Sequence, residues 1–219
     1  MQPTTPLQYK AYEAIKQNIL QGVYQPGQMY SETRIAGELG ISRTPVRDAI
    51  LRLSQERYLD ILPNRGFVLH QLTKEDVEQT IQMRCAIEGH CSWALARECD
   101  TPAARKTLKL LRSLVERQHK LMDRPKALPD FLELDSRFHT TLVDFSGNPH
   151  FRELFDSYLH RFRDLAAHSL SHPGRMEQTW QEHEAMVQAM EAGDPAAAYQ
   201  ATLLHMESPR EISIPDPLA

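Results

Sequence analysis

Residues 39–49 read Leu-Gly-Ile-Ser-Arg-Thr-Pro-Val-Arg-Asp-Ala, and this stretch decides the fold of the first third of the chain. Within it, Ser42 is of a type that caps helices, and Pro45 stands in the first helical turn, where no backbone donor is missed. Gly40 interrupts the chain just before, after a short helix that we expect Ser31 to cap. The stretch therefore predicts two short helices joined by a tight turn.

The neighbouring sequence adds the elements that complete a small domain. Upstream, residues 7–21 have the apolar spacing of an amphipathic helix, and turn-forming residues follow at 24–27. Downstream, residues 58–62 and 67–69 read as two short strands, which a Pro-Asn-Arg-Gly turn at 63–66 joins. Helix, helix, short turn, helix and hairpin in this order predict a winged helix-turn-helix.

The helix that the quoted stretch opens carries side chains that suit a DNA groove. Arg43 and Arg47 are four residues apart and share a face, and arginine is the usual reader of guanine O6 and N7. Thr44 can reach a phosphate or a thymine methyl, and Arg65 with Gly66 suits a backbone or minor-groove contact. The alternative, a solvated helix face, leaves the Ser-Arg-Thr-Pro turn unexplained.

Four motifs occur here in the order seen in a known family: Gly22-x-Tyr24-x-Pro26-Gly27, Ser31-Glu32, residues 39–49 and Asn64-Arg65-Gly66. They resemble the DNA-binding domain of GntR-type bacterial transcription regulators. There are two departures, since Arg34 stands one place after the usual arginine position, which is Thr33, and Arg57 replaces the usual glycine before the first strand. We expect Arg34 to contact phosphate. The candidate DNA contacts are Arg34, Ser42, Arg43, Thr44, Arg47, Arg65 and Gly66.

Composition excludes several classes of protein. The chain has 219 residues, of which 41% are hydrophobic and 25% charged, so it can bury a core and is not disordered. No apolar run approaches the roughly 18 residues of a membrane span, and residues 1–20 lack the pattern of a signal peptide. Cys85, Cys91 and Cys99 have the spacing of neither a disulfide framework nor a zinc ribbon. We expect a cytoplasmic protein with reduced thiols.

Charge and histidine are distributed unevenly along the chain. Residues 1–72 hold eight Lys or Arg and six Asp or Glu, whereas residues 73–219 hold seventeen and twenty-three. Nine of the ten histidines also fall in the second part. A mildly basic head on an acidic, histidine-rich body places any polyanionic partner at the head.

From residue 73 onward the pattern is helical throughout. Thr73 with Asp76 approximates a capping box, and three later starts place Pro directly after a capping residue. The six predicted helices span 74–99, 102–123, 129–146, 149–171, 175–192 and 195–208. Short connections favour antiparallel neighbours. The predicted fold is therefore mainly α: a winged helix-turn-helix domain over 1–72, then a six-helix antiparallel bundle over 73–219.

One set of bundle residues has the spacing of a metal site. Asp135 and His139 are four residues apart and project from one helix face. In an up-and-down bundle, the helical rise places His139 about 12 Å and His183 about 15 Å from one bundle end. His205 and Asp135 lie about 18 Å from the same end. Three imidazoles and a carboxylate at similar levels suit Zn²⁺ or Ni²⁺, whereas the alternative is a chance grouping of ordinary histidines.

The six-helix body resembles the FCD domain of FadR-type regulators within the GntR family, especially the VanR-like members. In metal-binding FCD domains the ligands are an Asp-x-x-x-His pair and two later histidines. Asp135, His139, His183 and His205 match all four. The resemblance also implies a small carboxylate effector bound above the metal.

Two arginines are candidates for binding the effector. Arg84 lies on the first body helix, where the family commonly has an effector-facing arginine, and its alternative is an exposed ion pair with Glu88. Arg161 flanks an aromatic stripe over residues 151–162 and falls at a similar level. We interpret the stripe itself as core.

The two resemblances cover nearly the whole chain and imply a bacterial homodimer that binds double-stranded operator DNA as a repressor. An organic acid at the metal would then control operator affinity. One alternative makes the metal itself the signal. Another is a metal-dependent hydrolase with Glu182 or Glu184 as the base, but no catalytic motif supports an enzyme.

Overall fold

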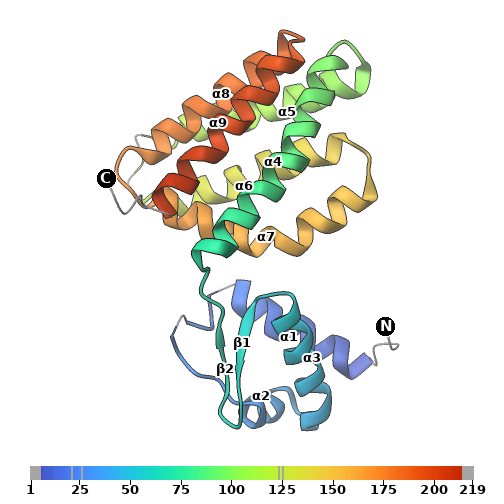
Figure 1. Ribbon diagram of the computed structural model, residues 1–219, viewed down its shortest axis with the longest axis vertical. Helices are drawn as coiled ribbons and strands as arrows, with labels where there is room; N and C mark the ends of the chain where they lie inside the picture. Colours follow the sequence, from blue (N-terminus) through green and yellow to red (C-terminus); the bar gives the residue numbers. More distant parts are fainter. Residues whose placement is uncertain (1–5, 21, 26, 123, 125, 214–219) are drawn as a thin grey trace. The chain divides into compact units, whose positions relative to one another are not determined.

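The computed structural model describes residues 6–20, 22–25, 27–122, 124 and 126–213, so residues 21 and 26 of the predicted helix and turn lie outside the described part. The chain divides into two compact units, Met1–Leu72 and Thr73–Ala219. Figure 1 shows the first as helices with a two-stranded ribbon and the second as helices alone. Residues 70–73 connect the last strand of the first unit to the first helix of the second.

The N-terminal unit is the predicted winged helix-turn-helix. Its elements are α1 (Pro6–Leu20), α2 (Glu32–Leu39), α3 (Arg43–Gln55), β1 (Leu59–Leu62) and β2 (Gly66–Leu69). The strands are antiparallel, with Leu59 opposite Leu69. Ile15, Val46 and Leu53 are buried at the centre of the unit, where α1 packs on α3.

The two serines expected to cap helices behave differently. The Ser31 hydroxyl accepts a hydrogen bond from the backbone N–H of Arg34, which caps α2 as predicted. Ser42 does occupy the N-cap position of α3, but its side chain makes no capping hydrogen bond, so this prediction was wrong in its mechanism. Ser42 is exposed, and its hydroxyl is therefore not used by the helix.

Gly66 holds the hairpin against the loop before α2. Tyr30 and Phe67 exchange two backbone hydrogen bonds, of 2.8 and 2.9 Å, and their rings stack. Gly66 has φ +121°, and a Cβ there would lie 2.0 Å from the Tyr30 carbonyl oxygen. The close approach that this glycine allows is thus to the protein's own backbone.

We expect Gly66→Ala to destabilise the N-terminal unit by about 2–4 kcal/mol, because the hairpin must move away from Tyr30. Gly27→Ala is the matched control: Gly27 also has a positive φ, +76°, but nothing lies within 4 Å of an added Cβ. It should cost only about 1–2 kcal/mol. Urea denaturation measures both, and equal losses would contradict the role given to the close approach.

The C-terminal unit contains the six predicted helices. They are α4 (Lys74–Arg97), α5 (Pro102–His119), α6 (Leu128–Phe145), α7 (Pro149–Leu170), α8 (Arg175–Glu191) and α9 (Pro195–Ser213). Thr73 and Asp76 form the predicted capping box, with backbone and side chain paired in both directions. Thr101, Asn148 and Asp194 also accept capping hydrogen bonds as expected.

Two helix ends differ from the prediction. α5 ends at His119 rather than at 123, because the chain tightens into hydrogen bonds between residues three apart at Leu121 and Met122. α9 continues past 208 to Ser213 and includes Pro209. The Arg210 guanidinium lies 2.8 Å from the Glu78 carboxylate of α4, which fixes this last turn.

The helices pack so that α9 lies between α4 and α8, beside both (Figure 1). α5 packs on α6 and on α8, and α6 also contacts α4 and α7. Phe155 and Phe162 of the aromatic stripe are buried, and Phe151 and Tyr158 pack at the edge of the core, as predicted. In the described part of the chain, none of the helices has the length and apolar character needed to cross a membrane.

Candidate functional site

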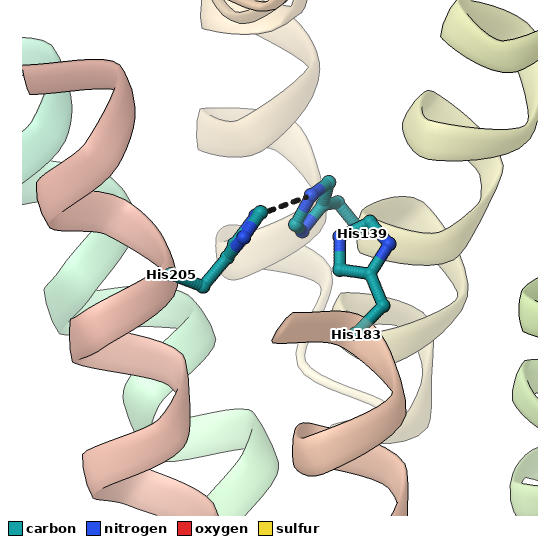
Figure 2. A group of neighbouring side chains, drawn as sticks. All are labelled: His139, His183 and His205. Carbon is teal, nitrogen blue, oxygen red and sulfur yellow. Dashed lines mark hydrogen bonds between the residues drawn. The ribbon is translucent and has the colours of Figure 1, made fainter. Parts of the chain in front are cut away.

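Three histidines from three helices meet in the interior of the C-terminal unit. His139 lies on α6, His183 on α8 and His205 on α9, and each is 3% exposed or less. One ring nitrogen of each lies within 4.8 Å of the other two. Figure 2 shows the three rings directed toward one another. The three histidines that the helical rise predicted at similar levels of the bundle therefore do lie close together.

One distance between ring nitrogens of the triad equals the distance between two ligands of a tetrahedral metal ion. The Nε2 atoms of His139 and His205 are 3.3 Å apart. With metal–nitrogen bonds of about 2.0–2.1 Å, a tetrahedron places its ligand atoms about 3.3–3.4 Å apart. Asp135 Oδ1 lies 3.7 Å from His139 Nε2 and 3.8 Å from His183 Nε2, next to the triad.

Each imidazole is oriented through its other nitrogen. The Nδ1 of His139 lies 2.5 Å from Glu88 Oε2, and the Nδ1 of His183 lies 2.9 Å from Gln118 Oε1. The Nδ1 of His205 lies 2.7 Å from Glu182 Oε2. Because these oxygens accept hydrogen bonds, each Nδ1 carries a proton, and Nε2 is the ring nitrogen that faces the centre of the cluster, where the Nε2 atoms of His139 and His205 share a hydrogen bond. This is how ligating histidines are held in metal sites.

Burial and neighbouring charges shift the pKa values of the three imidazoles in different directions. Burial, together with the neighbouring histidines, lowers the pKa of His183 well below its usual range, and burial also lowers the pKa of His205. Burial acts the same way on His139, but the Glu88 and Asp135 carboxylates together outweigh it and raise the pKa of that imidazole. His183 Nε2 is buried and has no hydrogen-bond partner. A bound cation would satisfy this atom.

Two ionised carboxylates form the next layer. Glu88 accepts a 2.7 Å hydrogen bond from Arg84 Nε, and Glu182 accepts two from Arg175, at 2.7 and 2.8 Å. Burial raises the pKa of both carboxyl groups, but their arginine and histidine partners outweigh it and lower each pKa to about 2. Both groups therefore stay negative next to the imidazoles.

A small cavity of about 10 Å³ adjoins the histidines, which is room for about one water molecule. It is lined by Arg84, Asp135, Ser136, His139 and Arg163, and by apolar residues at Leu132, Phe155, Leu159, Phe162 and Ala166. Arg84 does pair with Glu88, but the pair is buried, so the alternative of an exposed ion pair was wrong. The burial follows from the packing of α4 against α6, α7 and α9.

Arg161 does not line this cavity. Its guanidinium lies over the ring of Tyr158, 4.7 Å from the centroid, on another side of α7. Arg163 lines the cavity instead, and the two differ because residues two apart on a helix point in nearly opposite directions. This cavity therefore gives no support to the prediction that Arg161 binds the effector.

The N-terminal unit has a groove of about 420 Å³ that joins α2, α3 and the hairpin turn. Its lining includes Ser31, Glu32, Thr33, Arg43, Arg47, Asn64, Arg65 and Gly66. The side chains of Arg43 and Arg47 are 61% and 62% exposed, and each lies 3.4 Å from the Glu32 carboxylate. Arg34 lies outside this lining and pairs with Glu38 at 2.7 Å.

Several of these residues were not found from sequence. Glu88 and Glu182 were noted for other roles, as an ion-pair partner and as a possible base, and their link to the histidines was missed. Gln118 gave no signal at all, because its contact with His183 spans 65 residues of sequence. Glu32 was noted only as part of a motif.

A winged helix-turn-helix unit joined to a unit made of helices is typical of one class of protein, the DNA-binding transcription regulators. Residues 7–69 match the family of bacterial regulatory proteins called the gntR family, and residues 79–208 match the FCD domain. The chain belongs to the gntR family and carries an FCD domain. This family and the relatives below are transcription regulators, not enzymes, which rules out the hydrolase alternative.

Curated relatives align with most of the length of this chain. An uncharacterized HTH-type transcriptional regulator in the TAR-I ttuE-ttuC' intergenic region of Agrobacterium vitis is 37% identical, covering 61% of this chain and 77% of its own. The HTH-type transcriptional repressor RspR of Escherichia coli is 25% identical over 94% and 89%. Among solved structures, a GntR regulator from Rhodococcus matches with a TM-score of 0.74 and 20% identity, over 95% and 98%, which shows the fold.

Proposed function

We propose that this chain is a cytoplasmic, homodimeric repressor whose operator affinity is controlled by a small organic acid bound at a metal in the FCD domain. The observation that carries the proposal is the buried triad of His139, His183 and His205, each with its Nδ1 held by an oxygen of another helix. Such oriented, dry imidazoles suit a divalent transition metal, zinc or nickel by the donor set.

The three histidines and Asp135 would hold the metal. When bound, the metal supplies a positively charged position that a carboxylate oxygen can occupy. Arg84 lines the same cavity with a buried guanidinium, which suits the second oxygen of that carboxylate. Since the cavity holds about one water molecule, an acid can enter only if Phe155, Leu159 or Phe162 of α7 moves.

The movement of α7 side chains that admits an acid could also transmit effector binding to the DNA-binding unit. Residues 70–73 join the two units along the chain, and both ends of this connector are held: His70 by Asp60 at 2.8 Å, and Thr73 by the capping box. A change in the packing of the bundle helices would therefore be passed to the N-terminal unit through this short connector. In a dimer it would change the spacing of two winged units on a pseudo-palindromic operator.

DNA contact is proposed for the exposed residues around the groove of the N-terminal unit. Arg43 and Arg47 would read bases, Thr44 and the unused Ser42 hydroxyl would reach phosphate, and Arg65 would extend from the hairpin turn. Gly66 would act by allowing the turn to lie close to the α2 loop. Arg34 would contribute a phosphate contact from outside the groove.

Arg43→Ala should weaken operator binding by about 1–3 kcal/mol and relax base preference, because a bidentate contact to guanine is lost. The operator is first isolated by selection from random duplex DNA, and affinity is measured by fluorescence anisotropy. Arg105→Ala is the control, since Arg105 is an exposed arginine of the C-terminal unit. Unchanged binding by the Arg43 variant would contradict the groove as the DNA surface.

Metal and acid should stabilise the FCD domain together. Thermal unfolding of untagged protein is measured after chelation and after loading with zinc or nickel, each across a panel of organic acids. We expect chelation to lower the melting temperature and at least one acid to raise it only when metal is present, through binding linkage. His183→Ala removes the triad and should abolish both responses.

Other outcomes separate the alternatives. If chelation lowers the melting temperature but no acid raises it, the effector is of another chemistry or the metal itself is the signal. Operator affinity measured against metal concentration then decides between these two. If neither chelation nor metal changes stability, the metal site is wrong and only the DNA-binding half of the proposal stands.

A further inference from the structure

The three oxygens that orient the histidines are not equivalent. Gln118 offers a neutral amide to His183. Glu182 serves His205 and is shared with Arg175 and Ser208, neither of which lines the cavity. Glu88 serves His139 and is shared with Arg84, which does line it.

Glu88 divides its carboxylate between a cation and an imidazole. Its Oε1 accepts from Arg84 Nε at 2.7 Å, and its Oε2 accepts from His139 Nδ1 at 2.5 Å. Glu88 is 0% exposed and Arg84 3%, so water does not screen these contacts. The Arg84 guanidinium also lies over the Phe162 ring, 5.0 Å from the centroid, which keeps it at the cavity wall.

This arrangement sets two opposite effects on His139. A carboxylate that accepts from Nδ1–H increases the electron density and basicity of the imidazole, and so strengthens Nε2 as a ligand. A guanidinium on the same carboxylate withdraws part of that density. Arg84 and Glu88 therefore act against each other on one metal-facing nitrogen, although neither faces the metal.

We infer that Glu88 is a positioning residue that couples the cavity to the metal: an anion that engages Arg84 releases Glu88 to His139 and tightens metal binding. The inference rests on the metal site proposed above and adds the residue that regulates it. Linkage is reciprocal, so bound metal would tighten anion binding by the same factor. Gln118 and Glu182 have no such connection among the described contacts, so they hold their histidines without sensing the cavity.

The test compares zinc affinity, by competition with a chromophoric chelator, in the full-length protein and its variants. Glu88→Gln keeps the side-chain shape but not the charge, and should weaken zinc binding about 10- to 100-fold. Arg84→Gln should tighten it about three- to tenfold, because a positive charge on the shared carboxylate is removed. Arg152→Gln is the matched control: Arg152 also bridges two carboxylates, Asp144 and Asp156, but away from the site, and should change nothing.

The direction of the Arg84 effect separates coupling from simple support. If Arg84 only held the site in place, Arg84→Gln would weaken zinc binding, and this result would overturn the inference. The double variant is equally informative: tightening by Arg84→Gln should shrink in the Glu88→Gln background. An undiminished effect would mean that Arg84 acts on the metal directly through space, which also overturns the role of Glu88.

Two further readouts complete the test. The visible absorption of the cobalt-loaded protein should shift in Glu88→Gln, since the ligand strength of His139 changes, but not in Arg152→Gln. If Arg84→Gln is too unstable to assay, unchanged zinc affinity in Glu88→Gln alone overturns the inference. A wild-type protein that takes no zinc from the chelator instead overturns the metal site itself, so the two failures are distinguishable.

Discussion

The C-terminal unit depends on one constraint: three imidazoles from three helices must be held close together in a dry interior, each by an oxygen that accepts a hydrogen bond from its Nδ1. The 3.3 Å hydrogen bond between the Nε2 atoms of His139 and His205 needs a proton on one of them, and the buried Nε2 of His183, which has no hydrogen-bond partner, costs stability. The hydrogen bonds to Nδ1 offset part of this cost. The helices that carry the rings therefore rely on apolar packing elsewhere in the core to stay folded.

The buried charges follow from the same constraint. A carboxylate next to each of two imidazoles needs a cation of its own, and Arg84 and Arg175 provide one each. The N-terminal unit differs from this arrangement of buried ion pairs. Its two arginines, Arg43 and Arg47, are exposed, and the half-buried Glu32 carboxylate lies between them. There the Glu32 carboxylate lies 3.4 Å from each of two exposed guanidinium groups, and solvent screens both pairs.

Much of the fold could be predicted because short stretches of sequence determine where its helices and turns begin and end. Capping residues and prolines at helix starts gave five helix boundaries correctly, since caps act within one turn. The errors arose where contacts distant in sequence decide. α9 continues past Pro209, which is buried and stands next to the Arg210 that pairs with Glu78 on α4, and Arg161 was misplaced because rotation about a helix axis is set by packing.

The sequence by itself determined the winged helix-turn-helix, the six helices and the common level of the three histidines, because periodicity, capping and helical rise are local properties. Only the tertiary structure decided what surrounds those histidines. Their acceptors, Glu88, Gln118 and Glu182, lie 51, 65 and 23 residues away along the chain. Which side chains meet across helices depends on how each helix is rotated in the packed core, and no local pattern records that rotation.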